Sequence, residues 1–170
     1  MKNYVKVTGL LEIEAILNKE LATIKVDSER GMIKAFAFIR RETESSSPKT
    51  PVEYGNLRAS WFVATHKRAV VGKGSAKFNG PDGAKIATEH EEQVTQAVGE
   101  TKVLTTPSRV AVMGGYTANY ATLVHEKIGV RNWSRAGSGP KWLETHMKRN
   151  ILKIIGIIKE DIKIKRGKII

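Results

Sequence analysis

A stripe of apolar residues at helical spacing near the start of the chain constrains its fold more than any other sequence feature. Between residues 10 and 39 these side chains recur at steps of three and four, the period of one face of an α-helix. Gly31 interrupts the stretch, and glycine costs a helix interior about 1 kcal/mol relative to alanine. The segment is either one long helix or two helices that meet near residues 27–31, and we favour one. The stripe consists of Leu10, Ile13, Ile16, Leu17, Leu21, Ile24, Met32, Ala35, Phe36 and Ile39.

Short strands and helices are predicted after this helix. Ser47 and Thr50 each precede a proline, which disfavours helical geometry and ends the first helix within the polar residues 42–51. Bulky and β-branched residues predict a strand at 60–65, which residues 69–71 extend or pair with, and alternation predicts another strand at 108–115. Residues 120–126 are typical of a short helix or turn. Pro140 suits the first turn of a final helix.

An acidic helix is predicted within this basic chain. Residues 82–100 contain five acids and one lysine, and their apolar residues are few. Because a core helix needs a broad apolar face, we expect an insertion that protrudes or faces a partner. The glycine-rich segments 72–83 and 129–140 are expected to project as loops. The whole pattern predicts a single α+β domain, residues 1–170, in which a long N-terminal helix and a C-terminal helix pack on a small, mostly antiparallel sheet; residues 163–170 are expected to be a flexible tail.

The composition excludes several functional classes. The chain contains no cysteine, which excludes disulfide scaffolds, cysteine-ligated zinc and thiol catalysis. Its 170 residues, 41% of them hydrophobic, suffice for one folded domain. No apolar run reaches the ~20 residues of a membrane span, and the N-terminus lacks the apolar core of a secretory signal. We therefore expect a protein that is made and kept in the cytoplasm and has no membrane partner.

The chain carries a large positive charge, concentrated near its end. Lysine and arginine number 29 against 17 acidic residues, for a formal net charge of +12. Half of this charge falls within residues 141–170. A basic face of this kind fits a phosphate backbone, and the same pattern also describes a solvated helix face followed by a tail. The charge leaves a sequence-independent nucleic-acid-binding protein as an alternative function.

The sequence offers no assembled set of catalytic or cofactor-binding residues. Its histidines are not paired at the spacing of a metal-binding helix, and it has neither a nucleophile elbow nor a phosphate-binding glycine loop. We therefore expect no enzyme activity, no metal and no cofactor. A weaker alternative is a small nuclease or other hydrolase that uses His125 and Glu126.

Three short segments resemble one family of virion proteins. Residues 50–61, Thr-Pro-Val-Glu-Tyr-Gly-Asn-Leu-Arg-Ala-Ser-Trp, are similar to the Thr-Pro-Val-Asp-Thr-Gly-Asn-Leu-Arg-x-Ser segment of the head–tail joining and tail-completion proteins of long-tailed bacteriophages, also described as neck, minor capsid or tail-component proteins. Residues 120–126, Tyr-Ala-Thr-Leu-Val-His-Glu, resemble the family's Tyr-Ala-x-x-Val-Glu/His-Glu segment. Residues 139–143, Gly-Pro-Lys-Trp-Leu, resemble the Gly-x-Lys-Trp/Phe-Leu start of its last helix. The segments follow the family's order and cover about 24 residues.

The resemblance implies a non-enzymatic virion protein that forms a ring, expected to be a hexamer, at the neck between portal complex and tail. Its partners would be further copies of itself, the portal or adaptor proteins, and the tail-terminator or tail-tube proteins. DNA would pass through the lumen without specific binding. The protein would be assembled in the host cytoplasm and located in the virion neck or tail.

The residues of these segments divide into structural positions and candidate contacts. Gly55 permits a tight chain reversal, Leu57 and Trp61 are expected to be buried, and Arg58 is left to point outward. A ring needs two different surfaces on each subunit, and we predict that the acidic helix meets a basic surface of a neighbour. The structural positions are Pro51, Gly55, Leu57, Trp61, Tyr120, Val124, Pro140, Trp142 and Leu143. The candidate interface residues are Arg58, Glu89, Glu91, Glu92, His125, Arg131 and Lys141.

Overall fold

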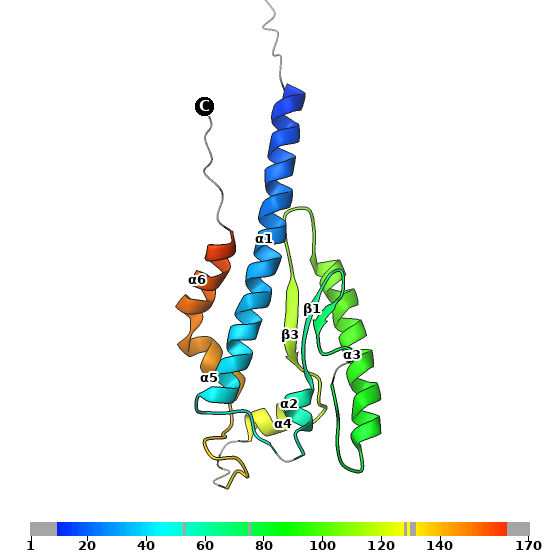
Figure 1. Ribbon diagram of the computed structural model, residues 1–170, viewed down its shortest axis with the longest axis vertical. Coiled ribbons are helices and arrows are strands. Elements are labelled where there is room, and N and C mark those ends of the chain that lie inside the picture. The colour runs from blue at the N-terminus through cyan, green and yellow to red at the C-terminus, as the bar shows by residue number, and fades with distance from the viewer. Residues whose placement is uncertain (1–9, 53, 75, 128, 130–131, 163–170) are drawn as a thin grey trace, which may run out of the picture.

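One long helix dominates the computed structural model, which describes residues 10–52, 54–74, 76–127, 129 and 132–162. Helix α1 (Leu10–Ser45) has 36 residues and is therefore about 54 Å long. It continues through Gly31, as predicted, and its first turns extend beyond the rest of the fold (Figure 1). The helix passes six residues beyond the apolar stripe before the polar segment ends it.

Three short antiparallel strands form the sheet, which confirms the predicted fold class. β1 (Trp61–Thr65) lies in the centre, between β2 (Ala69–Val71) and β3 (Val112–Tyr116). The last strand begins later than the predicted residue 108. Thr106 and Arg109 exchange backbone hydrogen bonds in a tight turn, and such a turn keeps these residues out of the sheet.

The sheet lies between two helical layers (Figure 1). On one face, Trp61 and Val63 of β1 pack against Phe38 and Ile39 of α1. On the other face, Phe62 and Ala64 pack against Val94 and Ala97 of α3 (Gly83–Leu104). Because successive strand residues point to opposite faces, one five-residue strand supplies both halves of the core. All five residues of β1 are buried.

Helix α3 is a core helix, so the prediction that it protrudes is wrong. That its acidic face meets a partner stays a prediction. Its buried positions follow one narrow stripe at steps of four, three and four. Small side chains suffice there because the helix lies close to the sheet. The histidine of the stripe is satisfied by two partners, with Nδ1 2.6 Å from the Thr117 hydroxyl and Nε2 2.9 Å from the Gly72 carbonyl oxygen. The stripe consists of His90, Val94, Ala97 and Thr101.

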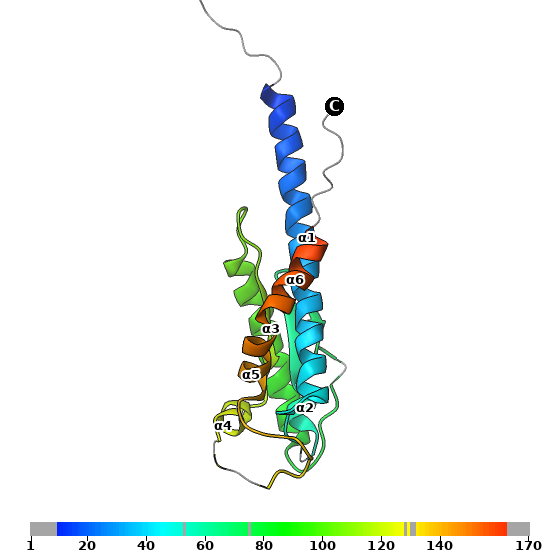
Figure 2. The ribbon, with the colours of Figure 1, turned by 90° about the vertical axis from the view of Figure 1, so that its left-hand side faces the viewer.

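The predicted final helix is two helices, α5 (Trp142–Arg149) and α6 (Ile151–Asp161), which pack along α1 (Figure 2). They are separated at Asn150, whose side-chain amide donates to the carbonyl oxygen of His146. Leu143, Ile154 and Ile157 reach the core beside the Trp61 cluster. Lys141 occupies the N-cap of α5, which places Pro140 one residue outside the helix rather than in its first turn.

Two short helices close the end of the molecule opposite the free tip of α1 (Figure 1). They are α2 (Asn56–Ala59) and α4 (Ala121–Glu126); the second lies where a short helix or turn is predicted and is a helix. Among the helices of the described ranges, none combines the length and apolar character needed to cross a bilayer. The tail expected at 163–170 lies outside the described residues.

Candidate functional site

The three family-like segments converge into one buried cluster, although they are far apart in the sequence. Leu57 of the first, Ala121 of the second and Trp142 of the third pack together with Ala118. Trp142 is only 1% exposed. Val124 and Leu143 complete the contact layer, and Tyr120 also packs there. The segments therefore form one structural unit, with the buried positions predicted for Leu57 and Trp61.

Tyr116 of β3 links this cluster to the main core. Its ring contacts Trp61 edge-on at a centroid distance of 5.0 Å and Trp142 at 5.9 Å. Its hydroxyl lies 2.9 Å from the hydroxyl of Thr50, which is fully buried at the start of the first segment. This role of Tyr116 could not be predicted from the sequence, because the residue lies outside all three segments.

Backbone geometry fixes the turn of the first segment. Gly55 adopts a φ of 85°, in the left-handed region that glycine enters without a steric penalty. Pro51 before it is buried. Lys49 accepts a hydrogen bond from the Gly139 N–H at 3.3 Å, which ties this turn to the third segment.

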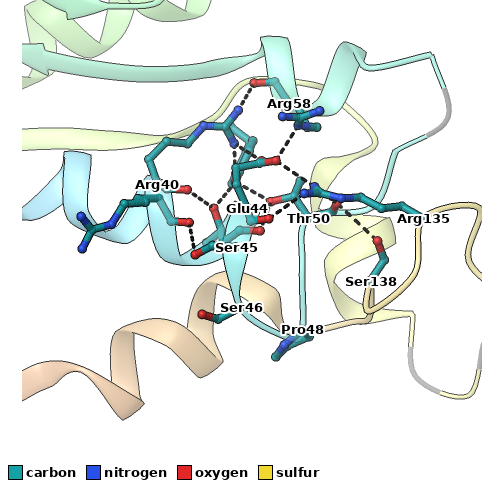
Figure 3. Close-up of polar contacts among 12 residues, drawn as sticks. Arg40, Glu44, Ser45, Ser46, Pro48, Thr50, Arg58, Arg135 and Ser138 are labelled. Carbon is teal, nitrogen blue, oxygen red and sulfur yellow. Dashed lines mark hydrogen bonds and ion pairs between the residues drawn. The ribbon is translucent and has the colours of Figure 1, made fainter.

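Three arginines surround the carboxylate of Glu44 (Figure 3). Arg40 approaches one oxygen at 2.9 Å, while Arg58 and Arg135 approach the other at 2.6 and 2.8 Å. Three positive groups around one acid leave two uncompensated charges. Of these three arginines, the family-like segments indicate only Arg58. The spacing of four between Arg40 and Glu44 is the one sequence signal for the rest of this cluster.

Arg58 combines an internal ion pair with exposure to solvent. Its side chain is 44% exposed and faces outward beside Glu44. Arg40 is held more firmly, because its guanidinium also donates to the Arg58 carbonyl oxygen and lies over the Trp61 ring. Arg58 therefore belongs to the ion cluster and remains accessible to a neighbour.

A second ionic network joins α4 to the start of α5. Glu126 pairs with Lys141, and this hydrogen bond is the main cause that lowers the pKa of Glu126 and raises the pKa of Lys141. His125 Nδ1 lies 2.7 Å from Glu126, and the histidine ring packs edge-on against Trp142. Lys141 also lies 3.2 Å from Glu144. Glu126 therefore joins His125 and Lys141 within one subunit.

The acidic residues of α3 differ in their availability. Glu89 accepts a hydrogen bond from Asn119 at 3.1 Å, and Glu91 accepts one from the backbone N–H of Gly74 at 2.6 Å. Glu92 is exposed and has no partner within the described part of the chain. Arg131, the remaining candidate, lies outside the described residues. Of the acidic candidates, Glu92 is the one left free for a neighbour.

Three of the histidines contact groups of the fold itself. His90 and His146 are buried, and His146 Nε2 lies 3.1 Å from the carbonyl oxygens of Ser46 and Pro48. His66 lies 3.1 Å from Glu29. No cluster of three or more histidine, aspartate or glutamate side chains that could hold a metal ion occurs among the described residues.

The projecting part of α1 exposes an apolar surface. Every residue from 11 to 23 is exposed, and these turns extend beyond the sheet and beyond α6 in both views (Figures 1 and 2). The side chains at helical spacing on this part are between 55% and 62% exposed. We call them the projecting stripe; they are Ile13, Ile16, Leu17 and Leu21.

A groove opens beside the packed part of α1. It has a volume of about 420 Å³ and runs between α1, β1 and β2. Its lining is mainly apolar, with three cationic side chains. We call it the basic groove; its apolar lining includes Ile33, Ala37, Val63 and Val71, and its cations are Arg40, Arg58 and Lys77.

A pocket of about 430 Å³ also lies at the loop end, where Pro51, Leu57 and Val124 of the family-like segments contribute to its wall.

No protein-family model matches the chain, and no curated protein or solved structure does so.

Proposed function

We propose that this protein is a structural component of a bacteriophage virion that forms a homomeric ring at the neck, between portal complex and tail. The convergence of the three family-like segments carries this proposal. Segments 50–61, 120–126 and 139–143 meet around Trp142, which is the arrangement expected if they are signatures of one fold unit.

The exposed apolar surface supports self-assembly. Ile13, Ile16, Leu17 and Leu21 face water at the free end of α1. Fully burying a leucine or isoleucine side chain stabilises by roughly 1.5–3 kcal/mol, and contiguous exposed apolar surface is typical of interaction sites. A ring in which a neighbour covers this surface would recover that free energy.

In this proposal the protein acts by shape and contact, without turnover. Each subunit binds two neighbours through different surfaces, and six subunits close the ring. The two faces of the ring bind a portal or adaptor protein and a tail-terminator or tail-tube protein, and DNA passes through the lumen without specific binding. Assembly takes place in the host cytoplasm, and the protein becomes part of the virion.

Imaging and sedimentation of the purified full chain test this function. We expect closed rings in negative-stain images and a sedimenting species with the mass of six copies. A protein that stays monomeric across the accessible range of concentration and salt would overturn the proposal. A catalysed cleavage of DNA that His125→Ala abolishes in a folded protein would contradict the non-enzymatic role.

Sequence-independent nucleic-acid binding is the second candidate, because the formal charge is +12 and Lys153 and Lys159 of α6 are exposed. Electrostatic binding would weaken steeply with salt, in proportion to the number of phosphates neutralised. Titration of a fluorescent duplex at two salt concentrations separates the candidates. Tight, salt-sensitive binding by a monomer favours this alternative over the ring.

A further inference from the structure

Two surfaces of α1 are complementary in shape and charge, and one copy cannot join them to each other. We propose that the projecting stripe of one copy occupies the basic groove of the next copy, in a head-to-tail contact. This inference rests on the proposed ring and names the two surfaces that would form it.

The projecting stripe continues the face of α1 that is buried lower in the fold. Ala35 lies 18 residues after Leu17, which is five full helical turns, so both residues share one face. Ala35 is 5% exposed, whereas Leu17 is 57% exposed. The difference arises because α6 and the sheet cover this face only along the packed part of α1. The stripe is therefore a core-like surface that lacks a cover within the described part of the subunit.

The basic groove exists because α1 leaves part of the sheet uncovered. Val71 of β2 pairs with Val63 of β1, so both side chains point to the α1 side of the sheet. Val63 is 2% exposed, but Val71 at the sheet edge is 45% exposed. Ile33 and Ala37 of α1 form the opposite wall. The volume of about 420 Å³ accommodates a few large aliphatic side chains, which is what one face of a helix presents.

The charges of the two surfaces are opposite. Glu14 and Glu20 lie three residues before and three residues after Leu17, on the same side of the helix. Residues 11–21 contain three acids and one lysine, in a chain whose formal charge is +12. The groove carries three cations, two of which share the carboxylate of Glu44 with Arg135. The projecting part of α1, which combines apolar side chains with acidic ones, therefore fits this groove better than a basic surface of another copy would.

The projecting stripe and the α1 wall of the basic groove lie on opposite sides of one helix, and this placement makes the contact head-to-tail. Ile33 and Ala37 follow Leu17 by 16 and 20 residues, which places them about 160° and 200° around the helix at 100° per residue. Different patches that meet form a heterologous contact, which propagates to a closed ring or a filament. The surfaces also lie about 18 Å or more apart along the axis, because Ile33 follows Leu21, the last residue of the stripe, by 12 residues. The ring closes when α1 is inclined to the ring axis, so that this offset runs around the ring.

The absence of cysteine permits a direct test by photo-crosslinking. A benzophenone is attached to Leu17→Cys, and the labelled protein is mixed with an equal amount of ¹⁵N-labelled wild-type chain. We expect adducts between copies at residues 33–40, 58–63 or 71–77. Leu152→Cys on α6 is the matched control, because Leu152 is 82% exposed and lies outside both surfaces. Its benzophenone should give no adduct in those ranges.

Adducts that fall mainly on residues 10–26 of another copy would show that the projecting helices pair with each other and would overturn the inference. Adducts confined to the same copy, including its residues 163–170, would overturn it as well. Imaging of the unlabelled protein distinguishes a failure of the surface pairing from a failure of the proposed ring. Rings without groove adducts refute the surface pairing and leave the ring standing, whereas a monomer without adducts refutes both.

Discussion

Gly31 of α1 lies where the backbone of α6 passes, so that a Cβ atom added to it would be 2.9 Å from the Cα atom of Ile158. The sequence presents this glycine as a weak point of the helix. In the fold it is a position that permits a close approach of α1 and α6. A methyl group there has no flexible neighbour to displace, because the two nearest atoms belong to the backbone of Ile158.

Gly31→Ala is therefore expected to destabilise the protein by about 1–3 kcal/mol, as overpacking does, although alanine is the better helix former. Gly99→Ala in α3 is the matched control, because nothing lies within 4 Å of its added Cβ. That substitution should stabilise by about 0.5–1 kcal/mol. Urea unfolding of both variants measures the difference. Equal stabilisation by the two alanines would show that α6 does not pack closely on Gly31.

Alanine substitutions of Trp61 and Arg58 are expected to have different effects on stability and assembly. Trp61 is 5% exposed, and Trp61→Ala should cost about 3–5 kcal/mol and reduce the yield of soluble protein. Arg58→Ala should cost about 1 kcal/mol or less, because Glu44 keeps two other arginines and the lost pair is partly solvated. Arg58→Ala should also weaken assembly, since Arg58 lines the basic groove. Thermal unfolding and size-exclusion chromatography of each variant test both expectations. A melting temperature of Arg58→Ala as low as that of Trp61→Ala would contradict the assignment of Arg58 to an interface.

Charge reversal on the projecting helix should weaken assembly. Glu14→Lys combined with Glu20→Lys turns two attractions to the groove into repulsions, and we expect association about tenfold weaker at low salt. The effect should shrink as salt screens exposed charges. Sedimentation equilibrium at two ionic strengths measures it. The matched control is Glu92→Lys, at an exposed position of α3. If that variant weakens association equally, the acidic helix takes part in the contact, as the sequence led us to predict.

Lys141 stands out because it adopts a left-handed backbone, with a φ of 57°. Its N–H donates to the His125 carbonyl oxygen at 2.7 Å, which helps to hold this conformation. Lys141→Ala and Lys141→Gly remove the same ion pairs, but glycine also removes the backbone strain. We expect the glycine variant to be about 1 kcal/mol more stable than the alanine variant. Equal unfolding midpoints in urea would argue against the left-handed conformation.

The pH dependence of stability should reveal the ion pairs that join Asp161 of α6 to α1. Asp161 binds Lys34 at 2.7 Å and Arg30 at 3.3 Å, and the Lys34 hydrogen bond is the main cause that lowers the pKa of Asp161 below 3.8. A lowered folded-state pKa contributes stability above the unfolded-state pKa, and this contribution is lost as the pH falls.

Wild type should therefore melt above Asp161→Asn at pH 7, and their melting temperatures should converge as the pH is lowered from about 5 through the folded-state pKa of Asp161. Asp82→Asn provides the matched control, because Asp82 is exposed at the start of α3 and its side chain makes no cap hydrogen bond. If the difference in melting temperature between wild type and Asp161→Asn persists unchanged at the lowest pH, the charge of Asp161 does not stabilise the contact between α6 and α1.

Local spacing alone was enough to predict the elements and much of the core. The steps of three and four define the buried face of α1, and the bulky run at 60–65 defines the central strand. The same spacing could not show that only part of the α1 stripe is covered. Coverage depends on where α6 and the sheet end, and these segments lie more than twenty residues away in sequence. Leu17 and Leu21 share this helix face with Ala35 and Ile39, yet the first two are exposed and the last two are buried.

The sequence by itself determined the long helix, the antiparallel sheet, the buried tryptophan at 61 and the three segments that resemble the neck proteins. Tertiary structure decided the role of α3, whose narrow stripe became core because the sheet approaches closely enough for small residues to fill the gap. It also decided the cluster around Glu44, since Arg135 lies 91 residues away and only folding brings the two together. Periodicity is a property of neighbours along the chain, whereas charge pairing, grooves and uncovered faces arise from the packing of segments that are distant in sequence.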